Sequence, residues 1–184
     1  MIVVGVDEAG RGPLVGSVVA GAVVLPPSFD LPELTDSKKL SEKKRESLYA
    51  LITQQCQWAV GQSSAQEIDE INILQATMLA MKRAVENLGL KYDQVLVDGN
   101  RCPDLHHCTA IIKGDLTEPV ISAASIIAKV TRDRQMQALD RQHPQYGFAK
   151  HKGCGTKIHL AALKQHGAIK AEHRFSFAPI KRLS

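Results

Sequence analysis

Five short apolar segments predict the strands of a sheet. Residues 2–7 and 17–25 are rich in β-branched side chains and almost continuously apolar, which is typical of strands buried on both faces. Residues 57–64 predict a third strand. Two more runs, 94–97 and 109–112, each lead into a turn that contains a glycine, and they predict two further strands.

Longer segments with a spacing of three or four residues predict helices. Residues 41–55 begin with Ser41, a residue type that caps helix N-termini. The clearest apolar stripe consists of Ile71, Leu74, Met78, Met81, Val85 and Leu88. Gly89 follows this stripe as a C-cap, and we expect its two methionines to fill the core. Residues 122–142 and 156–166 predict two more helices, ending before Pro144 and at Gly167.

The order of these elements predicts an α/β fold with a mixed central sheet flanked by helices. A long helix separates the strands at 2–7 and 94–97, which suits parallel neighbours joined by a crossover. Both strands would then end at one edge of the sheet, where α/β domains usually bind ligands. With 184 residues, the chain is long enough for one domain with a substantial core.

Acidic residues follow several of the predicted strands at this edge. Asp7 and Glu8 follow the first strand, Asp98 the fourth, and Asp115 comes just after the fifth. Acidic residues at strand ends often cap turns and helices, and for each residue alone this interpretation stays open. Four together would repel one another unless they bound Mg²⁺ or Mn²⁺, which prefer oxygen ligands. The pattern favours a two-metal site for phosphodiester cleavage.

A Gly-Arg-Gly triplet, Gly10 to Gly12, comes soon after the acidic pair. Neighbouring residues of a regular strand point to opposite faces, so Asp7 and Glu8 can share a site only if the chain turns there. The glycines allow such a turn. They would also leave backbone N–H groups open to a phosphate.

The charge of the chain permits a nucleic-acid partner without requiring one. The net charge is +4 and the isoelectric point is about 8.9, and basic residues gather near 38–45 and 150–157. Such runs form either solvated helix faces or phosphate contacts. No apolar run approaches the ~20 residues of a membrane span, and no basic segment precedes the apolar start. We therefore expect a soluble, cytoplasmic protein with no membrane association.

The four cysteines include no CxxC pair. The segment "RCPDLHHC" raises the possibility of a zinc site formed by Cys102, His106, His107 and Cys108. Its spacing matches no common structural zinc site, and no second ligand pair is evident. Reduced thiols in a cytoplasmic protein are the favoured interpretation.

Eight segments carry a resemblance to a known family. They are "GVDEAGRGPLVG", "DSKKLSEKKR", "EIDEINILQATMLAM", "LVDGNRCP", "KGD", "ISAASIIAKVTRDR", "YGFAKHKG" and "HRFSFAPIKR". In their order and spacing they resemble the bacterial ribonuclease HII family, the type 2 ribonucleases H, from Met1 almost to Ser184. The resemblance implies a ribonuclease H-like domain over residues 1–184, with residues 144–184 as a C-terminal helical extension packed near the active site.

The resemblance also implies an activity. Members hydrolyse the RNA strand of RNA–DNA hybrids with Mg²⁺ or Mn²⁺, and incise duplex DNA 5′ to single embedded ribonucleotides, leaving 3′-hydroxyl and 5′-phosphate ends. The catalytic and metal-binding residues then correspond to Asp7, Glu8, Asp98 and Asp115. The expected partners are RNA–DNA hybrid and ribonucleotide-containing duplex DNA. We expect a monomer with no obligate protein partner.

The same resemblance implies substrate-binding residues. Gly10, Arg11 and Gly12 correspond to the loop that senses the ribose 2′-hydroxyl, and Ser37, Lys38 and Lys39 to a phosphate-contacting loop. Two positions depart from the family pattern. Cys154 stands where the family generally has a tyrosine that is thought to stack on a sugar next to the ribonucleotide, and Phe175 stands where a second basic residue is common.

Other titratable residues are expected to play no part in metal binding. Asp133 follows a helical pattern between two arginines, and we interpret it as structural. His151, His159 and His173 are expected to lie at the surface or to face phosphates.

Two other functions remain as alternatives. One is a nuclease with the same metal chemistry that acts only on DNA, such as a resolvase, and the Gly-Arg-Gly loop argues against it. The other is a catalytically silent nucleic-acid-binding module. A binder of phosphates gains nothing from a cluster of negative charge, so the four carboxylates count against it.

Overall fold

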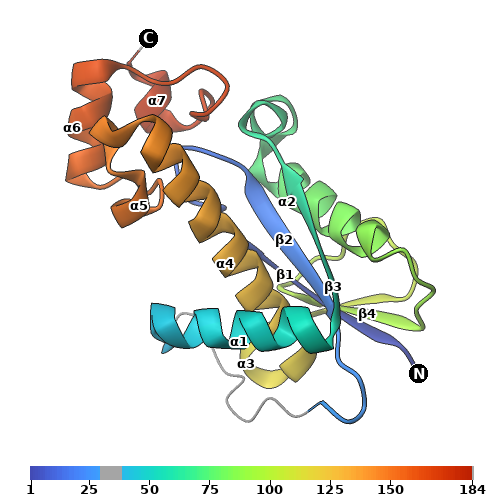
Figure 1. Ribbon diagram of the computed structural model, residues 1–184. Coiled ribbons are helices and arrows are strands. Elements are labelled where there is room, and N and C mark those ends of the chain that lie inside the picture. The colour runs from blue at the N-terminus through green and yellow to red at the C-terminus, as the bar shows by residue number, and fades with distance from the viewer. Residues whose placement is uncertain (30–38, 184) are drawn as a thin grey trace.

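A computed structural model describes residues 1–29 and 39–183 and contains a five-stranded mixed sheet (Figure 1). Strand β1 (Val3–Ala9) is antiparallel to β2 (Val18–Val24) and parallel to β4 (Gln94–Asp98). Strand β3 (Gln57–Ser63) pairs with β2, and β5 (Cys108–Ile111) pairs with β4, so the order is β3-β2-β1-β4-β5. The predicted α/β fold with a mixed sheet is confirmed, as is the parallel pairing of the first and fourth strands.

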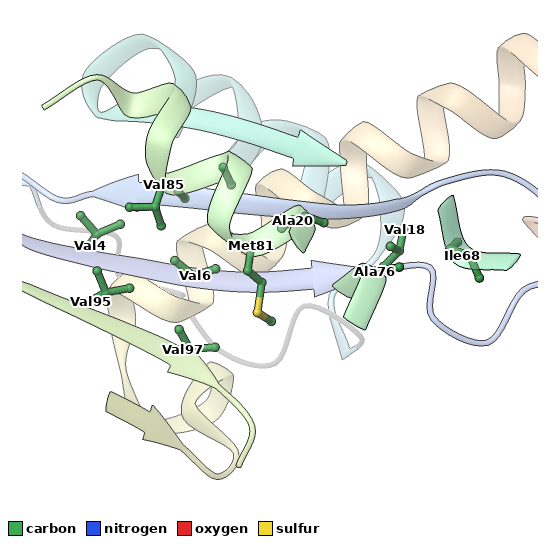
Figure 2. Packing of buried hydrophobic residues seen from close by; sticks show 13 residues of the cluster. Val4, Val6, Val18, Ala20, Ile68, Ala76, Met81, Val85, Val95 and Val97 are labelled. Atoms are coloured by element: carbon green, nitrogen blue, oxygen red, sulfur yellow. The ribbon is translucent and has the colours of Figure 1, made fainter. Parts of the chain in front are cut away.

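Helix α2 (Ala65–Leu88) covers one face of this sheet. Alternate residues of β1, β2 and β4 point toward it, as the period of two in a strand requires. Figure 2 shows the resulting buried cluster, to which the strands contribute Val4, Val6, Val18, Ala20, Val95 and Val97 and the helix contributes Ile68, Ala76, Met81 and Val85.

The contact face of α2 differs from the predicted apolar stripe. Met81 and Val85 of that stripe are buried, but Ile71 is 38% exposed. The helix approaches the sheet so closely that a Cβ on Gly61 would lie 2.3 Å from the carbonyl oxygen of Ala80. Small side chains therefore occupy much of the contact, and several larger residues of the stripe lie beside it.

Helix α2 also begins before the stripe. Ser64 and Glu67 form a reciprocal capping box at its start. The helix then bends at Asn72, whose backbone is left-handed (φ +71°), and the Asn72 side chain accepts the Gln75 N–H at 2.9 Å to restart it. The Ser-x-x-Glu spacing was the available signal for this early start.

The other face of the sheet is covered by α4 (Pro119–Gln142), with α1 (Glu42–Gln55) packed against it. The Ser41 hydroxyl accepts the Lys44 N–H, as expected for the N-cap of α1. The short α3 (Gly114–Thr117) leads into α4, which starts earlier than predicted, with Pro119 in its first turn. A Cβ on Gly5 would lie 2.3 Å from the Val120 carbonyl oxygen, so α4 also packs closely on β1.

The C-terminal segment packs on the far end of α4 (Figure 1). It contains a 3₁₀ turn (Pro144–Tyr146), α5 (Phe148–His151), α6 (Lys157–His166) and α7 (Ala178–Lys181). A third buried cluster joins these elements to the loop after β1, through Leu14, Val15, Met136, Leu139, Tyr146, Phe148, Leu163 and Ile180. None of the helices in the described part of the chain has the length and apolarity needed to cross a membrane.

Candidate active site

The parallel pairing of β1 and β4 brings two aspartates to one edge of the sheet. The register pairs Val6 with Val97, and the next residues on the two strands are Asp7 and Asp98. Because the strands run in the same direction, both side chains lie at the C-terminal edge.

Glu8 joins these aspartates without a turn between it and Asp7. We expected the chain to turn at the acidic pair. Strand β1 instead continues through Ala9, and the backbone first becomes left-handed at Gly10, where φ is +92°. One carboxylate oxygen from each of Asp7, Glu8 and Asp98 nevertheless lies within 4.8 Å of the others. The expected turn at the pair is therefore wrong. The reach of the longer glutamate side chain brings its carboxylate to the site.

The concentrated negative charge of Asp7, Glu8 and Asp98 is suited to binding a divalent cation. Asp7 is only 4% exposed, and its pKa is raised well above the usual range by burial and by the charges of Glu8 and Asp98. The Glu8 N–H donates to Asp7 Oδ1 at 2.8 Å and opposes this shift in part. An all-oxygen donor set with excess negative charge is suited to Mg²⁺ or Mn²⁺.

Asp115 lies beside this group, in the first turn of α3. Its backbone N–H donates to Asp98 Oδ1 at 3.2 Å, and its carbonyl oxygen accepts the Ser122 hydroxyl. The residue lines the same pocket but stands outside the set of three carboxylates whose oxygens converge. The structure thus brings Asp115 to the site through its backbone.

The carboxylates line an open pocket of about 600 Å³. Its other walls come from the loop after β1, from α4 and from the loop after α5. The lining residues include Asp7, Glu8, Gly10, Arg11, Gly12, Asp98, Asp115, Lys129, Arg132, Asp133, Lys152 and Cys154. Acidic ligands, a glycine loop and basic residues therefore face one space.

The predicted Gly-Arg-Gly loop lines this pocket and carries N–H groups without a protein acceptor in the described part of the chain. Among the described residues, none accepts a hydrogen bond from the N–H groups of Gly10, Arg11 or Gly12. The two glycines differ in kind. A Cβ on Gly10 would lie 2.4 Å from Arg132 Cδ, whereas a Cβ on Gly12 would meet no atom of the described residues within 4 Å. Gly10 is needed for packing, and Gly12 leaves the pocket open.

Asp133 also lines the pocket, but its carboxylate is paired. It accepts from Lys129 Nζ at 2.8 Å, one turn away on α4, and it is 6% exposed. Asp133 is not part of the group of converging carboxylates found among the described residues.

The expectation for the histidines is wrong for two of the three. His159 and His173 are buried, and their Nε2 atoms lie 3.0 Å apart. His151 is half-buried and stacks on the His159 ring. These rings pack against Tyr146 and Phe148 in the third buried cluster, where the surrounding apolar side chains exclude water.

The cysteines are free thiols. Cys154 is exposed and lines the pocket, whereas Cys102 is exposed outside it. Burial, with Cys102 nearby, raises the pKa of the Cys108 thiol to about 12. No group of three zinc-type ligands forms around these residues within the part of the chain that the structure describes.

The predicted phosphate-contacting loop is described only in part. Ser37 and Lys38 lie outside the described residues. Lys39 is exposed and is not among the pocket-lining residues.

Sequence reasoning missed two buried arginines that hold the loop after β1. Arg132 is 2% exposed and Arg174 is fully buried. No sequence signal marks an arginine whose partners are backbone carbonyls from distant segments. The glycines at 10, 16 and 153 hint at close packing, since a Cβ on each would meet Arg132 at 3.0 Å or less.

Comparisons with known proteins agree with this fold. The family model described as ribonuclease HII matches residues 4–180. Ribonuclease HII from Polynucleobacter asymbioticus is 61% identical over 187 residues, covering 98% of this chain and 95% of the relative. Ribonuclease HII from Vibrio campbellii is 58% identical over 183 residues, with coverage of 98% and 86%.

A solved structure shows the same architecture. The crystal structure of ribonuclease H2 from Pyrococcus horikoshii OT3 has a TM-score of 0.82 with this chain, at 27% identity, covering 100% of this chain and 97% of that one. The sequence and structural matches both extend over nearly the whole length. The chain therefore belongs to the ribonuclease HII family, hydrolytic nucleases that cleave the RNA strand of RNA–DNA hybrids.

Proposed function

We propose that this enzyme also incises duplex DNA on the 5′ side of a single embedded ribonucleotide. The products carry a 3′-hydroxyl and a 5′-phosphate. Asp7, Glu8, Asp98 and Asp115 are the ligands for two ions, either Mg²⁺ or Mn²⁺. Residues 1–184 act as one domain, a monomer that needs no other protein for the reaction.

The observation that supports this proposal is the position of the carboxylates beside unused amide donors. The convergent carboxylates of Asp7, Glu8 and Asp98 line the same pocket as Gly10 to Gly12, whose N–H groups have no acceptor among the described residues. A ribose 2′-hydroxyl accepts hydrogen bonds that a deoxyribose cannot. A ribose held at the loop therefore places its neighbouring phosphodiester next to the carboxylates.

Basic side chains in the pocket can hold the flanking phosphates. Lys129 and Lys152 line the pocket, with side chains 33% and 23% exposed. Lys129 forms an ion pair with Asp133, and Lys152 Nζ lies 4.0 Å from Glu42 Oε1. These partly buried ammonium groups offset the repulsion between a phosphate and the acidic cluster.

The roles divide as follows. The loop orients the sugar, the lysines neutralise phosphates, and the carboxylates act as metal ligands. Bound divalent ions supply the activation of a water molecule and the stabilisation of the departing 3′-oxygen. Hydrolysis breaks the phosphorus–O3′ bond, so the upstream strand keeps the hydroxyl and the ribonucleotide keeps the phosphate.

The test uses three DNA duplexes of one sequence, namely all-DNA, DNA with one ribonucleotide, and a full RNA–DNA hybrid. Each is incubated with Mg²⁺, with Mn²⁺ or with EDTA. The variant Asp98→Asn removes one converging carboxylate. Asp104→Asn is the matched control, because the Asp104 side chain is 98% exposed and lies outside this pocket.

We expect metal-dependent incision 5′ to the single ribonucleotide, lost in Asp98→Asn and retained in Asp104→Asn. Extension of the upstream product by a DNA polymerase confirms its 3′-hydroxyl. Cleavage of the hybrid alone would contradict the proposal, as would cleavage of the all-DNA duplex. Binding without cleavage in every metal would indicate a silent binding module.

A further inference from the structure

The guanidinium of Arg174 binds four carbonyl oxygens of one loop. Its Nε donates to Gly16 O at 3.0 Å, its Nη1 to Arg11 O at 3.0 Å and Pro13 O at 2.7 Å, and its Nη2 to Gly10 O at 2.6 Å. Arg174 lies more than 150 residues away in the chain, in the C-terminal segment. A single buried side chain thus organises the whole turn from Gly10 to Gly16.

These carbonyls replace the water that the charge of Arg174 loses on burial. The side chain is fully buried, and the pKa of Arg174 is lowered to about 9, chiefly by burial and then by the charge of Arg132. The forked guanidinium presents five N–H donors in a plane. A lysine ammonium carries the same charge but cannot reach four acceptors in this arrangement.

The consequence for the loop is a separation of donors from acceptors. Arg174 holds the carbonyls of Gly10, Arg11 and Pro13 on the protein side. The N–H groups of Gly10, Arg11 and Gly12 have no acceptor among the described residues, and all three residues line the pocket. Successive N–H groups that are exposed in this way form a binding concavity for polar and anionic groups.

A second contact fixes the position of Arg174 itself. Asp69, in the first turns of α2, accepts the N–H groups of Phe175 at 3.0 Å and Ser176 at 2.9 Å. The Arg174 N–H donates to Leu14 O at 2.8 Å. The chain on both sides of the Arg174 side chain is therefore held, by α2 and by the loop.

We propose that Arg174 is a positioning residue for sugar selection, which it achieves by holding the loop carbonyls inward so that the amide donors of Gly10 to Gly12 face the ribose. Asp69 of α2 helps to hold Arg174 in place by accepting the N–H groups of the next two residues. This inference rests on the proposed recognition of ribose at the loop. It assigns the selectivity to a side chain that does not touch the substrate.

The experiment measures selectivity and turnover separately. KM and kcat are determined on the single-ribonucleotide duplex, and Ki is determined for an all-DNA duplex of the same sequence as competitor. The ratio Ki/KM reports sugar selectivity. The variants are Arg174→Lys and, as the matched control, Arg182→Lys, because Arg182 is exposed in the same C-terminal segment.

In Arg174→Lys we expect KM to rise about tenfold while Ki stays unchanged, so that Ki/KM falls about tenfold. A variant that only lost folded protein would show a lower apparent kcat and the same ratio. Arg182→Lys keeps the wild-type ratio. An unchanged ratio in folded Arg174→Lys overturns the inference. A wild-type ratio near one would instead refute ribose recognition itself.

The variant Asp69→Asn keeps the test decisive if Arg174→Lys does not fold. It weakens the two backbone contacts next to Arg174 and leaves the arginine in place. We expect Ki/KM to fall about threefold, with kcat changed less than Ki/KM. A wild-type ratio in Asp69→Asn, with Arg174→Lys unfolded, overturns the positioning role.

Discussion

The Nε2 atoms of His159 and His173 lie 3.0 Å apart in a buried hydrogen-bonded chain. The Ile169 N–H donates to His173 Nδ1 at 2.9 Å, so the proton of neutral His173 is on Nε2 and is donated to His159. His159 then carries its proton on Nδ1, which donates to Cys154 O at 2.9 Å. Both rings must be neutral for this chain to exist, and it ends at a residue that lines the pocket.

The first prediction is a loss of stability in mild acid. The pKa of His173 is lowered to about 3, chiefly by burial and then by His159, His143 and His151. In the unfolded chain the pKa of histidine is about 6.5. The unfolded state therefore binds more protons between these values, and stability falls as the pH falls through 6.5 toward 3. We expect the free energy of unfolding in urea to be about 2 kcal/mol lower at pH 5 than at pH 7.5.

The control for this prediction compares two substitutions. His173→Asn should make the dependence of the unfolding free energy on pH shallower, because it removes one of two buried titrating groups. His159, whose pKa burial also lowers, remains and keeps part of the dependence. His107→Asn should leave the dependence unchanged, because His107 is exposed and asparagine tolerates its left-handed backbone (φ +54°). Equal slopes in wild type and His173→Asn would contradict the assignment.

The second prediction separates the two glycines of the loop. Gly10→Ala should lower the free energy of unfolding by about 2 to 3 kcal/mol, because its backbone is left-handed and its Cβ would meet the Arg132 side chain. Gly12→Ala should leave stability unchanged within about 0.5 kcal/mol. Gly12 lines the pocket and its Cβ position is open, so an added methyl leaves less space for substrate, and KM on the single-ribonucleotide duplex should rise several-fold. Urea titrations measure stability and steady-state kinetics measure KM. A stable Gly10→Ala together with a destabilised Gly12→Ala of unchanged KM would refute this distinction.

The third prediction concerns Cys154, at the position where the sequence resemblance implies a tyrosine. Its side chain is exposed at the pocket, so a tyrosine has room to stack on the nucleotide next to the ribose. Cys154→Tyr should raise kcat/KM on the single-ribonucleotide duplex about fivefold, equivalent to ~1 kcal/mol of stacking. Cys102→Tyr is the control, because Cys102 is exposed outside the pocket. An unchanged kcat/KM for Cys154→Tyr removes this position from substrate binding.

Sequence reasoning predicted the sheet well because its signals are local. Apolar runs and the helix between β1 and β4 were enough to place Asp7 and Asp98 at one edge. The face of α2 that contacts the sheet was harder to predict. The close approach of Gly61 to Ala80 decides which side chains fit between the helix and the sheet. Periodicity alone predicted that the larger apolar residues would form this contact, whereas alanines form much of it in the structure.

The hydrogen bonds that hold the loops of the candidate site could not be predicted, because they join segments that are distant in the sequence. Arg132 donates to Val15 O and Ser17 O, and also to Lys152 O. In the sequence, Arg132 and Arg174 look like ordinary charged residues, which are rarely buried. Only the fold shows that loop carbonyls surround them. The buried histidines were misjudged for the same reason.

The fourth prediction is that the carboxylate site limits stability when no metal is bound. Burial and the charges of Glu8 and Asp98 raise the pKa of Asp7, so the folded protein is destabilised by ionisation as the pH rises above the unfolded value of 3.8. Asp7→Asn removes this charge and keeps an oxygen to accept the Glu8 N–H. In EDTA at pH 7.5 we expect its free energy of unfolding to exceed that of wild type by about 1 to 2 kcal/mol.

Divalent ions should reverse this order, because they bind the folded wild-type protein and offset the repulsion. Thermal unfolding is followed while Mg²⁺ or Mn²⁺ is added to wild type, to Asp7→Asn and to Asp104→Asn. Wild type and Asp104→Asn should gain several degrees in Tm, and Asp7→Asn should gain little while losing activity. If Asp7→Asn were less stable than wild type in EDTA, the buried charge would not be the source of strain. If all three proteins gained equally with metal, the ion would bind elsewhere.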